Sequence, residues 1–324
     1  RHLLVHGLPA PKKAVPTLET FTPRFLEQYA KADRHKPSGV AAKETILRVH
    51  LIPVLGRLTL DAITDVEVQR LKGHLHEKAP KTVNNILTVL NTLLKTAKAW
   101  GVITQVPCTI RLVPASVPAM SCHDVGQYEH LVQASQTIDR TTALLVLLGG
   151  EAGLRCGEMI ALEWQDVDLP NHRLCIERSS WNGEVTSTKG GRLRYVPMTA
   201  RLHAALRQHK HLRSSRVLCE NDGTPLTRQQ VQYRVNRAAR IAGVKRGVHL
   251  LRHTFCSHLA MKGAPVGAIQ ALAGHQELSV TQRYMHLSPA ALDSAIRLLD
   301  QPLVLQSFGD LVETGRVSEG KIND

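Results

Sequence analysis

The chain has 324 residues, of which 43% are hydrophobic and 21% charged, so it can form one large domain or two ordinary ones and is not compositionally disordered. Its 41 Lys and Arg against 27 Asp and Glu give a formal net charge of +14, which favours nucleic acid as a partner, although ribosomal, membrane-surface and heparin-binding proteins share such a charge. The longest apolar run, residues 143–150, is far shorter than the roughly 18 to 20 residues of a membrane span, which excludes a transmembrane protein.

The first third of the chain predicts a small all-helical domain over residues 17–105. Residues 1–16 hold three prolines, show no sustained periodicity and begin with Arg1 rather than Met, so we interpret them as a linker or the remnant of an upstream segment. Apolar residues then recur at helical spacing, and the segment 36–39 is expected to break the first helix. Four helices are predicted: one from residue 17, one through residues 46–50 that ends before Pro53, one from Thr64 to about residue 78, and one over residues 82–100.

A second domain is predicted over residues 121–300. Residues 106–120 contain three prolines without a helical period, which indicates an extended inter-domain linker, and residues 301–324 form a tail. The second domain is mainly α with a small antiparallel β-sheet, because the two predicted strands, residues 173–177 and 194–197, flank a Gly-rich hairpin. Its helices are expected at residues 125–134, 140–148, 200–211, 228–242, 251–261, 266–273, 280–284 and 290–299.

Cysteine and histidine usage favours a protein without a metal centre. The six cysteines are scattered without a CxxC pair, and nothing at the N-terminus resembles a secretory signal, which together indicate a reducing cytoplasm. The 17 histidines form neither an HExxH motif nor a zinc spacing with cysteine, and no cluster of Asp and Glu resembles a two-metal site. We therefore expect no metal centre.

Four polar motifs stand out in the second domain. They are, in chain order, Arg155 with Glu158 three residues on, Lys189 within residues 188–192 at the hairpin tip, His249 with Arg252, and Gly274-His275 with Tyr284 nine residues later. Each alone has an ordinary structural explanation: a helical salt bridge, a solvated turn, a chance pair, a packed tyrosine. The spacing of three between His249 and Arg252 does put an imidazole and a guanidinium on one helix face, where both can bind the same anion.

Taken in order, these motifs resemble the boxes of the tyrosine recombinase, or phage integrase, family. The matching segments are Ala152–Arg155 with Glu158, His249–Phe255, Leu272–His275 and Thr281–His286. The resemblance covers about residues 122–299, and the helical domain before it is similar to the family's core-binding, SAM-like domain. Leu250 departs from the family pattern, which often has Asp at this position.

The resemblance implies which residues form the active site. Tyr284 would be the nucleophile, Lys189 would protonate the leaving 5′ oxygen, and four residues would surround the scissile phosphate: Arg155, His249, Arg252 and His275. Fixed guanidiniums suit this chemistry because attack on a phosphodiester builds charge on its non-bridging oxygens. A phenol, with an ordinary pKa of about 10, also needs a nearby base such as His249.

The function implied by the resemblance is site-specific DNA recombination through a covalent 3′-phosphotyrosyl intermediate, without ATP, metal or other cofactor. The enzyme would act in the cytoplasm, associated with a bacterial nucleoid and encoded by a bacterium or phage. Its partners would be specific double-stranded DNA sites, paired by a homotetramer whose two domains clamp the duplex. An accessory DNA-bending or directionality factor is a further candidate partner.

Integration or excision of a phage or other mobile element is favoured over Xer-type resolution of chromosome or plasmid dimers, because the start at Arg1 suggests a missing arm-binding segment upstream. Two rivals are a non-catalytic DNA-binding protein in which Tyr284 is merely packed, and a type IB topoisomerase. The complete motif set argues against the first rival. The small helical domain and the Gly-His box before Tyr284 argue against the second.

The tail carries four large apolar side chains that would be costly to expose: Leu303, Val304, Leu305 and Phe308. Pro302 discourages continuation of the preceding helix, so the segment can leave its own domain. In the resembling family the C-terminal segment packs onto a neighbouring protomer. We therefore expect docking in trans, with docking in cis as the alternative.

Overall fold

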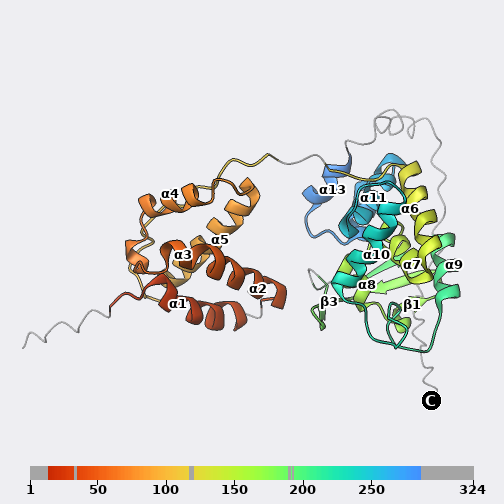
Figure 1. The fold of residues 1–324 in the computed structure, drawn as a ribbon, viewed down its shortest axis with the longest axis horizontal. Helices are drawn as coiled ribbons and strands as arrows, with labels where there is room; N and C mark the ends of the chain where they lie inside the picture. Colours follow the sequence, from red (N-terminus) through yellow and green to blue (C-terminus); the bar gives the residue numbers. More distant parts are fainter. Residues whose placement is uncertain (1–13, 33–34, 117–119, 189–190, 192, 286–324) are drawn as a thin grey trace, which may run out of the picture.

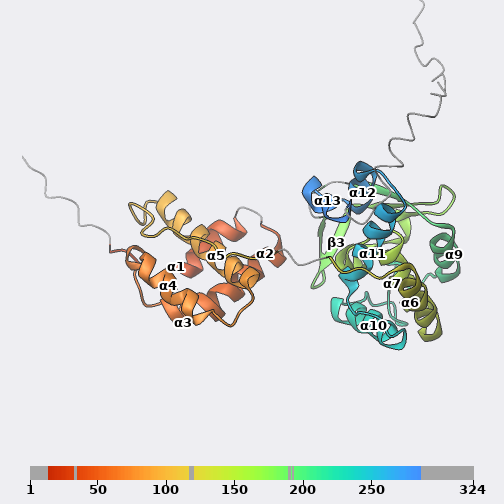
Figure 2. The ribbon, with the colours of Figure 1, turned by 90° about the horizontal axis from the view of Figure 1, so that it is seen from above.

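The structure, a computed structural model, describes residues 14–32, 35–116, 120–188, 191 and 193–285. These residues form two separate bodies, each with its own apolar core, and the extended segment after α5 runs from the first toward the second (Figure 1). The two bodies remain separate when the molecule is seen from above (Figure 2). The predicted class, mainly α with a small antiparallel sheet, is confirmed. The helix expected at residues 290–299 and the apolar tail lie outside the described residues.

The first body is helical throughout its described part. Its elements are α1 (Leu18–Arg24) with a π-helical continuation (Phe25–Lys31), α2 (Pro37–Ile46) with a π-helical continuation (Leu47–Leu51), α3 (Ile52–Leu55), a 3-10 turn (Leu60–Ala62), α4 (Asp65–His74) and α5 (Pro80–Ala99). The amphipathic pattern that predicted the last helix is confirmed, because one face of α5 supplies buried residues such as Leu87, Leu90 and Leu94 to the core.

The structure differs from three expectations for this body, and proline explains two of the differences. The segment 36–39 was expected to break the first helix, and that helix does end before it, at Lys31, but Pro37 begins α2, so Ser38 and Gly39 are helical. Proline is tolerated in the first turn of a helix because the amide it lacks would have no intrahelical partner there. Pro53 lies just after the π-helical segment, in the first turn of α3, and does not end the helical run. The helix from Asp65 also ends at His74, earlier than expected.

The first half of the segment after α5 is attached to the first body. The described residues 106–116 contain no helix, as expected for an extended segment. The side chain of Asn84 pairs with the backbone of Val113 through two hydrogen bonds of 2.9 and 2.8 Å, and Asp65 accepts a hydrogen bond of 2.8 Å from the Thr109 amide. The chain therefore stays on the first body up to Val113.

The second body surrounds a buried apolar helix. Its helices are α6 (Val125–Ile138), α7 (Arg140–Gly150), α8 (Cys156–Ala161), α9 (Ala200–His209), α10 (Arg228–Ile241), α11 (Val248–Met261), α12 (Val266–Ala273) and α13 (Leu278–Met285). From Thr142 to Gly150 every residue of α7 is buried, and α7 packs against α6, α9 and α11. This explains why the longest apolar run of the sequence lies here. Among the described helices, none has the length and apolar character needed to cross a membrane.

The strands form two small antiparallel sheets beside this core. β1 (Val167–Asp168), β2 (Arg173–Ile176) and β5 (Arg194–Pro197) form one sheet in the order β1-β2-β5, while β3 (Arg178–Trp181) and β4 (Glu184–Ser187) form a hairpin. The two strands expected from the sequence are confirmed as β2 and β5, and they pair directly, with Leu174 opposite Val196. The hairpin lies between β2 and β5 in the sequence. In both ribbon views it is close to α2 (Figures 1 and 2).

The α5 core tests the first body. We expect Leu90→Ala to lower the free energy of unfolding by about 2–5 kcal/mol, because the side chain is fully buried and truncation leaves a cavity. Lys95→Ala, on the exposed face of the same helix, should change it by less than about 0.5 kcal/mol. Guanidinium unfolding followed by circular dichroism measures both. Equal losses in the two variants would contradict the proposed packing of α5.

Candidate active site

Arg252 is held by the backbone carbonyl of Gly153, whose conformation and surroundings require glycine. Gly153 adopts φ +64°, a left-handed conformation, and a Cβ atom there would lie 2.5 Å from the ring of Phe255. Its carbonyl accepts a hydrogen bond of 2.6 Å from Nη1 of Arg252, which is 2% exposed on α11. The other terminal nitrogen, Nη2, is buried and has no hydrogen-bond partner within the described part of the chain. That nitrogen remains available for an anion.

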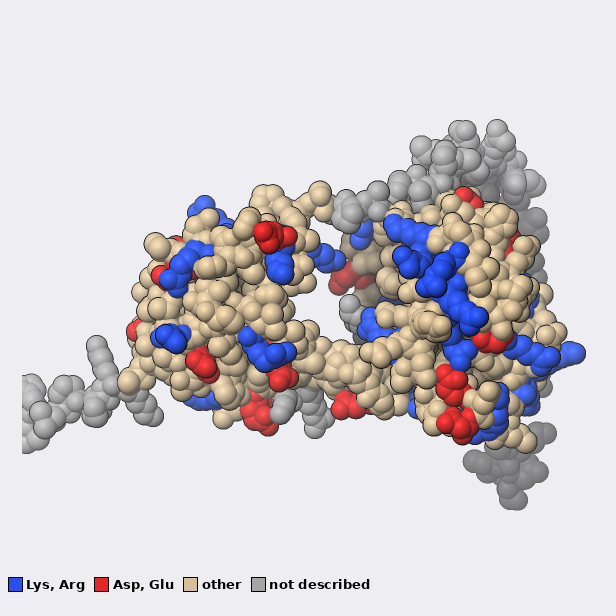
Figure 3. Space-filling view, viewed as in Figure 1, with Lys and Arg blue, Asp and Glu red and all other residues tan. Residues whose placement is uncertain are grey.

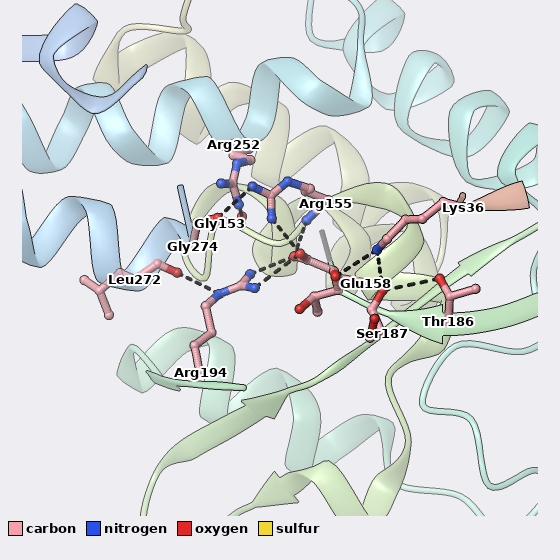
Figure 4. Close-up of polar contacts among 11 residues, drawn as sticks. Lys36, Gly153, Arg155, Glu158, Thr186, Ser187, Arg194, Arg252, Leu272 and Gly274 are labelled. Carbon is pink, nitrogen blue, oxygen red and sulfur yellow. Dashed lines mark hydrogen bonds and ion pairs between the residues drawn. The ribbon is translucent and has the colours of Figure 1, made fainter. Parts of the chain in front are cut away.

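Arg155 is held beside Arg252 by a second left-handed glycine. Gly274 ends α12 with φ +65°, and its carbonyl accepts a hydrogen bond of 2.9 Å from Nη2 of Arg155. Arg155 itself immediately precedes α8. Figure 4 shows the two guanidiniums next to each other, with the two glycine carbonyls behind them.

Glu158 bridges Arg155 and Arg194. Arg194 was not among the site residues expected from the sequence. Its carboxylate is 1% exposed and accepts hydrogen bonds of 2.7 Å from Arg155 Nη1 and 2.7 Å from Arg194 Nη2 (Figure 4). Arg194 comes from β5 and also donates to the Leu272 carbonyl at 3.0 Å. Burial by itself would raise the pKa of Glu158, but the hydrogen bond and charge of Arg194, together with Arg155, outweigh it and lower the pKa below 4.5.

Tyr284 is buried against α11 and surrounded by imidazoles. It is 1% exposed, on α13, and packs in a small cluster with residues such as Phe255 and Ile269. The His275 ring lies parallel to the tyrosine ring, at an interplanar angle of 3° and a centroid distance of 6.1 Å. The tyrosine hydroxyl lies 2.7 Å from Nδ1 of His253. The ring of Tyr284 is therefore packed, and its hydroxyl also has a polar partner.

The site carries excess positive charge. Burial, followed by the neighbouring Arg155, lowers the pKa of Arg252 to about 10. Desolvation and the same two arginines also lower the pKa of His275 to about 3, and desolvation with His253 and Arg252 lowers that of His249 to about 4. Both imidazoles are therefore neutral at pH 7. When the pKa values of several neighbouring basic groups are all lowered, positive charge is unfavourable in the pocket, and an anion is favoured there.

A groove with a volume of about 1180 Å³ leads to these residues. Arg155, Arg228 and His249 line it from the second body, and Lys36, the residue directly before α2, lines it from the first. Lys36 donates hydrogen bonds of 2.8 Å to the backbone carbonyls of Ser187 and Thr188 (Figure 4). This contact between the two bodies closes the groove on one side. Lys and Arg side chains also gather in a band across the second body (Figure 3).

The structure brings together five of the six residues expected from the sequence: Arg155, His249, Arg252, His275 and Tyr284. The sixth, Lys189, lies outside the described residues, directly after the end of the hairpin. Sequence reasoning missed Arg194 and His253. His253 stands inside a matching box, which was a usable signal, whereas nothing distinguishes Arg194 in sequence from other strand arginines. In the described part of the chain, no group of three His, Cys, Asp or Glu side chains could hold a metal ion.

Glu158 gives a pH-dependent test of this arrangement. We expect Glu158→Gln to lower the free energy of unfolding at pH 7 by on the order of 3 kcal/mol, because it leaves Arg155 and Arg194 without their buried counter-charge. A carboxylate whose folded pKa lies below 4.5 stabilises the fold above that pH and ceases to do so as the pH falls through the folded pKa. The difference from wild type should therefore shrink below about pH 4.5.

Denaturant unfolding at several pH values measures this difference. Glu184→Gln, which alters an exposed carboxylate on β4, is the matched control and should have little effect at any pH. A Glu158→Gln difference that is constant from neutral to acidic pH would contradict the bridging role.

Known proteins are similar to this chain in sequence or in fold. It is 27% identical to the tyrosine recombinase XerC of Alcanivorax borkumensis over 288 residues, which cover 84% of this chain and 90% of that protein. The integrase of transposon Tn1549, solved in complex with a circular intermediate DNA, has a TM-score of 0.71 at 19% identity and covers 89% of this chain and 99% of its own. A lambda integrase dimer bound to a COC′ core site has a TM-score of 0.67 at 20% identity and covers 82% and 97%.

The two integrases share the two-body helical fold with this chain. Their sequence identities of 19% and 20% are low, so this likeness establishes the fold and nothing further. The family model of the phage integrase family matches residues 124–291, which is more than half of the chain and contains all of the site residues described above. The chain therefore belongs to the phage integrase family of tyrosine recombinases, enzymes that break and rejoin DNA strands.

Proposed function

We propose that the protein recombines specific DNA sites by attack of Tyr284 on a phosphodiester held by Arg155 and Arg252. The observation that carries the proposal is the buried guanidinium of Arg252, whose Nη2 lacks a hydrogen-bond partner within the described residues. A buried cation without an anion is costly, and a phosphodiester supplies both the missing charge and the missing acceptor. A packed structural arginine would be expected to have its partners already.

The proposed reaction is a phosphoryl transfer without hydrolysis. The Tyr284 oxygen forms a bond to phosphorus, the bond to the 5′ oxygen breaks, and the 3′ phosphate remains on the tyrosine. The guanidiniums stabilise the charge on the non-bridging oxygens, and His249 and His275 complete the pocket. We assign protonation of the leaving 5′ oxygen to Lys189, because the hairpin that precedes it borders the groove.

The two bodies are proposed to grip the duplex from opposite sides. Residues 17–105 would be the core-binding part, residues 121–300 the catalytic part and residues 106–120 the linker between them. The net charge of +14 and the groove lined from both bodies support this division. A lambda integrase tetramer bound to a Holliday junction has a similar fold, with a TM-score of 0.70. It supports a homotetramer that pairs two sites. That the apolar tail docks in trans on a neighbouring protomer is a further part of the proposal.

Integration or excision of a mobile element, such as a phage genome, is our leading proposal for the outcome of the reaction, in the cytoplasm of a bacterium. The fold shared with the integrase of transposon Tn1549 supports it. Xer-type dimer resolution is the second candidate, and the similarity to a bacterial XerC over most of both chains favours it. The two differ in their DNA, because resolution recombines two copies of one site whereas integration joins two different sites. A two-site plasmid assay with and without candidate bending or directionality factors separates them.

Tyr284→Phe tests the nucleophile. We expect this variant to form no covalent adduct, because it lacks the attacking oxygen, while its DNA affinity stays nearly unchanged since one hydroxyl contributes little beside many phosphate contacts. The substrate is a nicked duplex that traps the cleaved state, carrying a site selected by the full chain from a randomised library. Adducts are counted on a denaturing gel.

Tyr233→Phe is the matched control, because Tyr233 is 65% exposed on α10 and should leave adduct formation intact. Covalent DNA on Tyr284→Phe would overturn the assignment of this residue. A wild-type chain that binds the selected site without forming any adduct would instead favour the non-catalytic DNA-binding protein.

A further inference from the structure

The hydroxyl of Tyr284 has a histidine partner that differs from the two histidines expected to act in the site. Nδ1 of His253 lies 2.7 Å from this hydroxyl, whereas Nδ1 of His275 lies 2.9 Å from the Thr281 hydroxyl. His249 lines the groove, on the side from which DNA would approach. We propose that His253 is the general base that takes the phenolic proton when Tyr284 attacks the phosphate, a role that rests on the proposed function.

The contact between the two side chains is set by the packing of α13 on α11. His253 follows Arg252 directly on α11, one helical turn after His249, and the His249 and His253 ring centroids are 4.6 Å apart. Tyr284 is buried against the same helix, so its hydroxyl cannot turn to water without moving α13. A base in direct contact with the reacting oxygen needs no further movement of its own.

Both partners are neutral before DNA binds. Burial, followed by the charges of Arg252 and Arg283, lowers the pKa of His253, and burial raises that of Tyr284. An uncharged phenol can then donate its proton to an unprotonated Nδ1, with the imidazole proton on Nε2. The titratable and charged groups that face the pair from α11, α13 and the loop after α12 are His249, Arg252, Cys256, His275 and Arg283.

The proton balance of the step is complete. As the Tyr284 oxygen bonds to phosphorus, its O–H bond breaks and the proton moves to Nδ1 of His253, which becomes an imidazolium. The 5′ oxygen leaves with the electron pair of its bond to phosphorus and takes a proton from a separate acid, for which Lys189 is our proposal. In the reverse reaction His253 returns its proton to the tyrosine oxygen, so religation regenerates the starting state.

The surrounding cations make this base dependent on DNA. An imidazolium beside Arg252 and Arg283 is unfavourable in the DNA-free protein, which keeps Tyr284 protonated and unreactive. A phosphodiester bound at Arg252 adds a negative charge to the pocket, and a negative charge favours the protonated imidazole. Activation of the nucleophile would therefore require an occupied phosphate site.

The experiment follows single-turnover cleavage of the selected nicked duplex across pH by full-length variants. His253→Gln retains a hydrogen-bonding side chain but cannot accept a proton. His249→Gln represents the rival base, and His258→Gln is the matched control, since His258 is on the same helix and contacts the His123 carbonyl at 3.0 Å. A second substrate carries a bridging 5′-sulfur at the scissile phosphate, because a thiolate leaves with little need of a proton and so removes the requirement for the acid.

We expect His253→Gln to cleave about 10²–10⁴-fold more slowly on both substrates, with DNA affinity unchanged. Its rate should continue to rise with pH where the wild-type rate has levelled, and added imidazole should partly restore His253→Ala. His258→Gln should keep the wild-type profile. If the wild-type chain cleaves and His253→Gln cleaves within about threefold of its rate with an unchanged pH profile, the proposal is overturned. A change of pH profile in His249→Gln alone would also overturn it. Failure of the wild-type chain to cleave would instead count against the proposed function.

Discussion

Two like-charged guanidiniums, the buried Arg252 and the partly buried Arg155, lie side by side in this protein, and the rest of the site depends on how that arrangement is tolerated. Their mutual repulsion and burial oppose it, as the lowered pKa of Arg252 shows. The carboxylate of Glu158 and the carbonyls of Gly153 and Gly274 offset this cost. These groups come from segments far apart in the sequence, so they can stabilise the two guanidiniums only when the fold is complete.

The same arrangement leaves the site incomplete without an anion. Glu158 is shared between Arg155 and Arg194, and among the described residues no carboxylate forms an ion pair with Arg252. Its effect reaches His249 and His275, whose lowered pKa values keep them neutral at pH 7. A phosphodiester would relieve all of these groups together. On our account the energy stored as unbalanced charge is returned when DNA binds, which couples binding to chemistry.

Helical spacing predicted the elements that carry the site, and the resemblance of the ordered motifs to the tyrosine recombinase boxes implied five of the residues found there. A period of 3.6 residues identified α5 and α11, and the spacing of three in His249 and Arg252 put both on one helix. Prolines at helix starts were mistaken for helix ends, since Pro37 fits a break and a first turn equally well. Arg194 could not be found from sequence, because its role comes from the pairing of β5 beside α12 and from Glu158 on another element. Contacts of that kind have no local signature.

The most direct measurement of the central claim compares cleavage of a normal phosphodiester with cleavage of a methylphosphonate, in which an uncharged methyl group replaces one non-bridging oxygen. If Arg252 acts by stabilising negative charge, Arg252→Ala should slow cleavage of the phosphodiester by several orders of magnitude and should lose far less on the methylphosphonate, which builds less charge. An equal loss on both substrates would contradict the account, because it would mean that Arg252 holds the fold together without acting on the charge of the phosphate.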